Sequence, residues 1–241
     1  MRKIACFIGC ILFLSACDKH DPILPGVRTA IFDAGSVTVL HENVPDLPET
    51  IDNPAPAACP YRQDSSNVIW RGDKKIFSGF PTSNSVKSDQ SPVCSGRYVY
   101  AGLTTGELVK VNGQTRQIVW IADIYRASNL TGGASVLDIV APIVLRGDYV
   151  YAGSIGDAFC KINAGNGAKK WCADIGTAMP FIVADNVVFV AGVDNHLYAL
   201  RVRDGVAYWR APIKNQAAPR YENKIISVGT QKFNAENGSE I

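Results

Sequence analysis

The stretch YVYAGSIGDAFCKINAGNGAKKW, residues 149–171, decides the fold. An apolar run ends at Gly153, a short turn leads to a second apolar run, and a glycine-containing turn precedes the closing Trp171. Short apolar runs bounded by glycine and polar residues are typical of strands that are buried on both faces. Glycine in the second turn supplies the positive φ that a tight connection between antiparallel strands requires. The stretch therefore predicts a small antiparallel sheet.

The same pattern occurs in four copies along the chain. Apolar runs that end in glycine occupy residues 98–102, 149–153, 187–192 and 223–229. In the first three copies a second apolar run and a turn follow, and the turns NGQT, NAGNG and RVRDG lead to Trp120, Trp171 and Trp209. The fourth copy reaches NAENGSEI, where the sequence stops before any tryptophan.

A repeat of about 40 residues, built only from short strands and turns, predicts the blades of a β-propeller. The expected fold is all-β, a partial propeller of about four blades, and the three closing tryptophans are expected to pack between neighbouring blades. The segment around Trp70 is a candidate for the end of a further blade. A β-sandwich is the alternative, which four aligned copies disfavour. The expected repeats lie at 93–124, 142–175 and 180–213, with an incomplete one at 219–241.

The N-terminus has the pattern of an export signal. Two basic residues precede an apolar run from Ile4 to Leu14, which is too short to cross a bilayer and typical of a signal peptide. The sequence LSAC at 14–17 resembles a bacterial lipobox, so residues 1–16 are expected to be removed and Cys17 to carry lipid. An ordinary secretory signal is the alternative. Asp18 follows the expected lipid site and leaves the choice between inner and outer membrane open.

Residues 17–66 are rich in Pro and in acidic or polar residues, which predicts a tether in front of a propeller at 67–241. Within the tether, Ile31, Phe32, Val37, Val39 and Leu40 are suited to one strand that docks on the body. The chain has 24 Lys+Arg and 22 Asp+Glu, and the two additional basic residues lie in the expected signal peptide. The rest of the chain has no net positive charge, so its composition does not indicate binding to the phosphates of a nucleic acid.

The repeat DNHLYALRVRDGVAYW at 194–209 is similar to that of the eight-bladed propellers named for pyrroloquinoline quinone (PQQ). With the lipobox and the tether, it resembles the BamB family of outer-membrane protein assembly factors. The resemblance implies a non-enzymatic, lipid-anchored periplasmic scaffold of the β-barrel assembly machinery, located at the outer membrane. It also implies as partners the POTRA domains of BamA, other subunits of the machinery, and outer-membrane protein clients.

The sequence departs from this family in its number of repeats, since the family has eight blades. A truncated reading frame is the favoured interpretation. The alternative is a pair of half-rings that dimerise, or a second chain that completes the ring.

No cofactor, metal site or catalytic residue is expected. PQQ enzymes of the superfamily use an Asp base, a calcium site and often a disulfide between adjacent cysteines, and the sequence has no adjacent cysteine pair. Acidic side chains that could bind calcium are spread over turns, where Asp commonly bonds to its own backbone, and the histidines lack metal-ligand spacing. These residues are Asp148, Asp157, Asp174, Asp185 and Asp194, with His20, His41 and His196.

Four cysteines remain after the signal and the lipid site, namely Cys59, Cys94, Cys160 and Cys172. In a hairpin whose turn centres on residues 165–166, Cys160 and Cys172 face each other across two antiparallel strands. The sequence therefore predicts a disulfide between them in an oxidising periplasm, with two buried thiols as the alternative.

Other functions remain open at this point. They are a quinoprotein dehydrogenase or its remnant, a general interaction propeller of the cell envelope, and a gene fragment without function.

Overall fold

The computed structural model describes residues 37–51, 59–82, 86, 91–124, 136–156 and 158–241. The chain divides into two compact units, Met1–Gly35 and Ser36–Ile241, and every described residue belongs to the second unit. The expected signal peptide, Cys17 and Asp18 lie outside the described residues.

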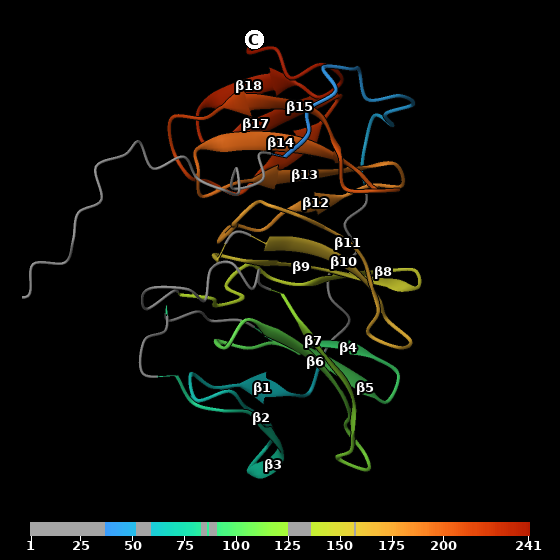
Figure 1. The fold of residues 1–241 in the computed structure, drawn as a ribbon, viewed down its shortest axis with the longest axis vertical. Helices are drawn as coiled ribbons and strands as arrows, with labels where there is room; N and C mark the ends of the chain where they lie inside the picture. The colour runs from blue at the N-terminus through green and yellow to red at the C-terminus, as the bar shows by residue number, and fades with distance from the viewer. Residues whose placement is uncertain (1–36, 52–58, 83–85, 87–90, 125–135, 157) are drawn as a thin grey trace, which may run out of the picture. The chain divides into compact units, whose positions relative to one another are not determined.

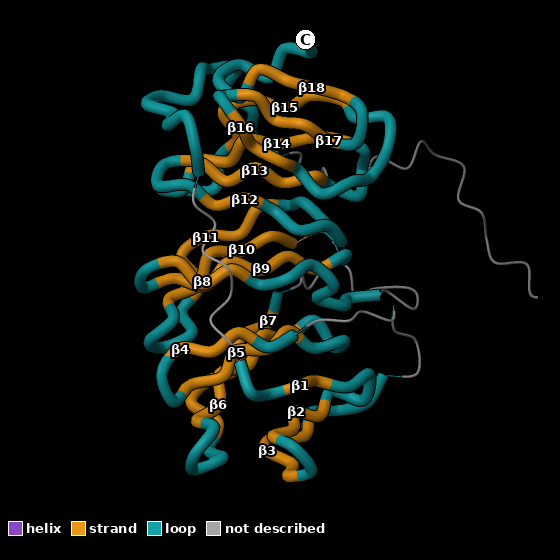
Figure 2. Tube along the Cα trace, turned by 180° about the vertical axis from the view of Figure 1, so that it is seen from behind, coloured by secondary structure: helices purple, strands orange, loops and turns teal. Residues whose placement is uncertain are grey.

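All regular structure in the described ranges is β-strand (Figure 2). Five antiparallel sheets follow one another in chain order (Figure 1). The first and fifth sheets contain β1 (Arg62–Gln63), β2 (Val68–Arg71) and β3 (Lys74–Ser78), and β16 (Arg220–Glu222), β17 (Ile225–Val228) and β18 (Gln231–Asn234). The three sheets between them contain β4 (Val93–Ser95), β5 (Tyr98–Gly102), β6 (Glu107–Asn112) and β7 (Ile118–Asp123); β8 (Val144–Arg146), β9 (Tyr149–Ser154), β10 (Ala158–Asn163) and β11 (Lys169–Ala173); and β12 (Ile182–Val183), β13 (Val187–Ala191), β14 (His196–Arg201) and β15 (Ala207–Pro212). The prediction of an all-β fold made of propeller-like repeats is confirmed.

The inner strands are mostly apolar because both faces of each sheet are buried. In β9 and β10, Val150 and Cys160 belong to the core shared with the preceding sheet, whereas Tyr151 and Phe159 belong to the core shared with the following sheet. Four buried clusters of this kind each join two consecutive sheets. Alternate residues of one strand therefore stabilise two different interfaces, which leaves no place for a polar face.

The first sheet gives Trp70 a different place from that of the other tryptophans. In the larger sheets, the pairing of the third and fourth strands contains a bulge. This bulge directly follows the residue pair that contains the tryptophan, such as Lys110↔Trp120. In the first sheet the same bulge follows the pair Ile69↔Phe77, so Phe77 occupies the register position of the tryptophan. Trp70 is instead half-buried, and its Nε1–H donates to the Asp64 carboxylate at 2.8 Å.

Residues 37–51, within the segment expected to be a tether, pack on the sheets, and they include Val37, Val39 and Leu40 of the docking strand that the sequence led us to expect. The Ala207 N–H of β15 donates to the Thr38 carbonyl at 3.0 Å, and the Leu40 N–H donates to the Ala207 carbonyl at 2.9 Å. Val39 forms a parallel bridge with Ala207, and it packs against the core between the third and fourth sheets. The apolar residues of this segment thus add an extended strand to the outer edge of β15.

Candidate interaction surface

The three closing tryptophans each bond to the next sheet along the chain. The indole Nε1–H of Trp120 donates to the Ala164 carbonyl at 3.2 Å. The same bond joins Trp171 to the Val202 carbonyl at 2.9 Å, and Trp209 to the Ala235 carbonyl at 3.2 Å. Each acceptor is the first residue after the third strand of the following sheet. A buried indole thereby satisfies its single donor while its ring covers the neighbouring turn.

A glycine in each of these turns leaves room for the indole ring. Gly167, Gly205 and Gly238 have φ of 75°, 75° and 74°. A Cβ atom on these glycines would lie 2.8, 2.5 and 2.5 Å from the rings of the docked tryptophans. Only glycine meets both requirements, since an L side chain is strained at this φ and would also collide with the ring.

Two lysines reinforce the same contacts from the adjacent strand. The Lys110 ammonium donates to the Ala164 carbonyl at 2.6 Å, and the Lys161 ammonium donates to the Val202 carbonyl at 3.1 Å. Each lies over a tyrosine ring, at 4.2 Å from the centroid for Lys110 and 4.0 Å for Lys161. Burial lowers the pKa of both lysines. Their protons are held at carbonyls between blades, so their role is to stabilise the interface.

The structure brings Cys160 and Cys172 together as paired residues of β10 and β11 and joins them by a disulfide. Cys160 is buried and Cys172 is exposed on the outer strand. A second disulfide joins Cys59 to Cys94. Sequence reasoning did not find this pair, because the two residues are separated by 35 positions and share no hairpin whose register could align them.

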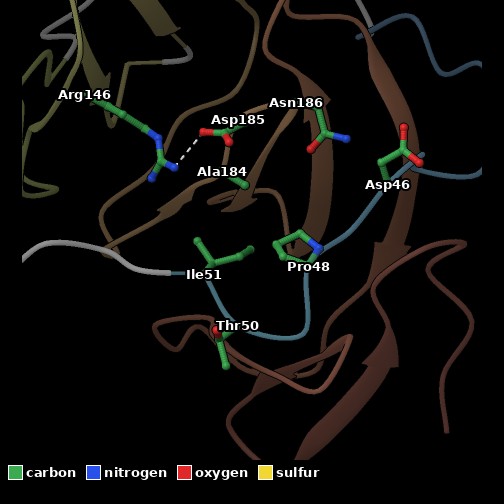
Figure 3. Close-up of a pocket in the computed structure, with 8 residues that line it drawn as sticks. All are labelled: Asp46, Pro48, Thr50, Ile51, Arg146, Ala184, Asp185 and Asn186. Carbon is green, nitrogen blue, oxygen red and sulfur yellow. Dashed lines mark hydrogen bonds and ion pairs between the residues drawn. The ribbon is translucent and has the colours of Figure 1, made fainter.

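A pocket of about 470 Å³ lies where residues 46–51 pass the end of β8 and the connection that follows β12 (Figure 3). Across one side of it the Arg146 guanidinium donates to the Asp185 carboxylate at 2.7 Å and to the Val183 carbonyl at 2.7 Å. The Asn186 side-chain amide donates to the Pro45 carbonyl. The lining residues are Asp46, Pro48, Thr50, Ile51, Arg146, Ala184, Asp185 and Asn186. The lining combines charged and polar side chains with apolar ones.

The histidines and acidic residues considered from the sequence are dispersed. His196 lies 3.3 Å from the Asp194 carboxylate at the start of β14, and His41 is exposed in the segment that precedes Val44. His20 and Asp157 lie outside the described residues. Within the described ranges, no three His, Cys, Asp or Glu side chains gather closely enough to hold a metal ion.

No helix in the part of the chain that the structure describes is long and apolar enough to span a membrane.

Five consecutive antiparallel sheets, three of which close with a tryptophan that docks on a glycine of the next sheet, define a protein of the PQQ-like β-propeller class. The family model described as outer membrane protein assembly factor BamB matches residues 33–211. The chain belongs to this family.

Individual relatives are distant. The outer membrane protein assembly factor BamB of Alkalilimnicola ehrlichii is 26% identical over 126 residues, which are 52% of this chain and 33% of that protein. The BamB of Moranella endobia is 21% identical over 148 residues, 60% of this chain and 38% of that protein. The chain thus spans between a third and two fifths of the length of these curated relatives. The crystal structure of BamB from Moraxella catarrhalis matches with a TM-score of 0.52 at 14% identity, over 77% of this chain and 61% of that one, which supports the fold.

Proposed function

We propose that this protein is a non-enzymatic scaffold of the β-barrel assembly machinery, which aids the folding and insertion of outer-membrane proteins. The observation that carries the proposal is the match of the BamB family model to residues 33–211. The interfaces between sheets add physical support, since indoles and ammonium groups bond neighbouring blades together. Sheets fixed in this way hold their connecting loops in constant positions, which a scaffold requires.

The proposed partners are the POTRA domains of BamA, other subunits of the machinery, and outer-membrane protein clients. The mechanism is positioning, because a partner that contacts several loops at once is oriented by the sheets that carry those loops. The pocket beside Arg146 and Asp185 is a suitable contact point, since it combines a half-buried cation with an exposed carboxylate. Polar contacts of this kind contribute orientation and specificity to an interface.

We also propose that the protein is anchored by lipid on Cys17 and faces the periplasm, at the outer membrane. Asp18 makes the inner membrane the alternative. Growth with labelled palmitate tests the anchor, because label is expected on the unmodified chain and absent from Cys17→Ser. Separation of inner and outer membranes on a density gradient then locates the labelled protein. Label retained by Cys17→Ser would contradict the assignment of the lipid site.

Copurification with BamA tests the function. The full chain is cross-linked in membranes and recovered through an affinity tag, and BamA is expected in the recovered fraction. The matched control is an unrelated lipoprotein with the same tag. Absence of BamA would contradict the proposal, and quenching of tryptophan fluorescence by PQQ with calcium would then favour the quinoprotein alternative. Absence of both would favour a general interaction propeller of the cell envelope.

A further inference from the structure

The outer strand of the second sheet, β7, exposes three apolar side chains within four residues. Ile118 is 52% exposed, Val119 is 43% exposed and Ile121 is 45% exposed. Single exposed apolar residues are common on protein surfaces, but a row of them on an edge strand offers both apolar side chains and unpaired backbone groups. Natural sheets normally protect such an edge, so this strand requires an explanation.

The same edge is protected in the next two sheets. Aligned by their tryptophans, Ile118 of β7 corresponds to Lys169 of β11 and to Ala207 of β15. On β11 the neighbouring position is also a lysine, Lys170, and charged side chains deter pairing of an edge with another chain. On β15 the edge is covered by residues 38–42 of the chain itself. At the end of β7, Asp123 is exposed and its carbonyl accepts from the Lys169 ammonium of the next sheet at 3.2 Å. From Ile118 to Ile121, however, β7 has neither a lysine nor an added segment among the described residues, and in this it differs from β11 and β15.

The covered edge of β15 shows how a strand can be added at this position. Ala207 directs its N–H and its carbonyl away from β14, and both bond to the added segment, at Thr38 and Leu40. Ala207 is paired with Leu200 just after the bulge of its sheet. Ile118 has the same relation to its sheet, since it pairs with Val111 just after the bulge. The backbone donor and acceptor of Ile118 therefore face the open edge, in the arrangement that binds an extended segment on β15.

We propose that β7 binds an extended segment of another polypeptide by parallel strand addition. The apolar side chains of the bound segment pack on Ile118 and Ile121 of β7. The exposed Arg116 lies two residues before the start of β7, so an acidic residue at the start of the segment would complete the match. Strands with alternating apolar residues are what an unassembled outer-membrane barrel presents. The inference deepens the proposed function, and it rests on that function for the source of the segment.

Binding of a labelled peptide to the purified full chain tests the proposal. The probe is a fluorescent peptide with the sequence VTVLHENV, residues 37–44, which is the segment that the chain already adds to β15. The β15 edge is occupied by the chain's own copy and the β11 edge carries Lys169 and Lys170, so of these three outer strands β7 is the one open to the peptide. Saturable binding by fluorescence anisotropy is expected. A peptide with proline at the position of Leu40 lacks the donor that bonds to the strand, and it is expected to bind at least tenfold more weakly.

Lysine variants of the protein locate the site. Ile118→Lys with Ile121→Lys copies the protection seen on β11, and it is expected to weaken peptide binding at least tenfold. Val193→Lys is the matched control, since Val193 is 40% exposed but lies in the connection between β13 and β14. Its affinity is expected to be unchanged. Equal affinity of the β7 variant and the unmodified chain, or no binding by the unmodified chain, would overturn the proposal.

A cross-link provides a second route that does not depend on the folding of the lysine variant. A benzophenone side chain at Ile121 is expected to cross-link to the peptide, whereas the same group at Val193 is not; the reverse result would contradict the proposal. All these measurements use only the chain and the peptide. They can therefore fail while BamA still copurifies, and succeed when it does not, so the two proposals are separable.

Discussion

The contact between Trp171 and Gly205 shows how a single residue type connects the sequence pattern to the assembly of sheets. From the sequence, the turn glycines were expected to have positive φ. This conformation explains the shape of the turn, but it does not explain why a tryptophan of the preceding sheet packs against it. In the structure the absent side chain of Gly205 is also the space that the Trp171 ring fills. The corresponding turn of the second sheet has Arg116 at φ 63°, so the backbone conformation alone does not impose glycine. The ring of the preceding sheet imposes it.

The two roles of glycine can be separated by two alanine substitutions. Gly147→Ala introduces a Cβ at φ 57° with no atom within 4 Å, so only backbone strain is expected, about 1–2 kcal/mol. Gly205→Ala adds a Cβ that would lie 2.5 Å from Trp171, so a further loss of about 1–3 kcal/mol is expected from overpacking. Urea denaturation of both variants measures the free energies of unfolding. Equal losses would show that the ring yields without cost.

The disulfide between Cys160 and Cys172 is tested by mass. Alkylation of the denatured protein is expected to modify the peptides that contain these cysteines only after reduction. Cys172→Ser is expected to lower the free energy of unfolding by about 2–3 kcal/mol, because the bond closes a short loop across β10 and β11. Reduction of a Cys59→Ser variant, which lacks the Cys59–Cys94 bond, should give a similar loss relative to the same variant before reduction. Equal alkylation with and without reduction would contradict the pairing.

At the scale of the element, the hairpin of β14 and β15 depends on the carboxylate in its turn. Asp204 accepts two bonds from the Arg201 guanidinium, at 2.8 and 2.6 Å, and these bonds lower the pKa of Asp204 against the opposing effect of burial. Because the folded pKa is below the unfolded one, this stabilisation is complete above about pH 4 and is lost as the pH falls through the folded pKa. The carboxylate is 35% exposed, so solvent limits the effect to about 1 kcal/mol or less.

Asp204→Asn is therefore expected to destabilise the protein near pH 6 and to have almost no effect near pH 2. Urea denaturation at the two pH values measures the difference. Glu222→Gln, a change to an exposed residue of β16, serves as the control and is expected to change the free energy of unfolding by less than about 0.5 kcal/mol at both. A loss for Asp204→Asn that is the same at both pH values would show that the carboxylate charge is not involved.

The strands were largely predictable, and their exceptions have identifiable causes. Continuous apolar runs between turn residues placed β5, β9 and β13 because both faces of an inner strand are buried. The first sheet was harder, since Trp70 marked the wrong strand and Phe77 holds the register position. The open edge of β7 could have been noticed from IVWI at 118–121, which lacks the lysines of KKWC at 169–172. The significance of this difference depends on whether the side chains are exposed at a sheet edge. That exposure cannot be known without the order of the strands in the sheet.

At the scale of the whole molecule, residues 37–51 link sheets that are distant from them in the sequence. Leu40 bonds to β15 of the fourth sheet, whereas the Val44 N–H donates to the Glu236 carbonyl beyond β18 of the fifth. Leu47 is buried in the core between these two sheets. The prolines of this segment favour extended backbone in a tether and in an added strand alike, whereas the apolar Val37, Val39 and Leu40 favoured a strand that docks on the body. The sequence did not identify the partner edge, which lies about 170 residues further along the chain.

If this segment joins the last two sheets, then its removal from the core should loosen them selectively. Leu47 is 5% exposed, and Leu47→Ala is expected to lower the free energy of unfolding by about 2–5 kcal/mol. Hydrogen exchange should accelerate in β16–β18, whose core includes Leu47, while the amides of β4–β7 keep their protection because their clusters do not contain it. Val119→Ala, at an exposed position of β7, is the control and should leave both regions unchanged. Uniform acceleration in all sheets would show instead that the molecule opens as one cooperative unit, and an unchanged β16–β18 would show that residues 37–51 rest on the fifth sheet without stabilising it.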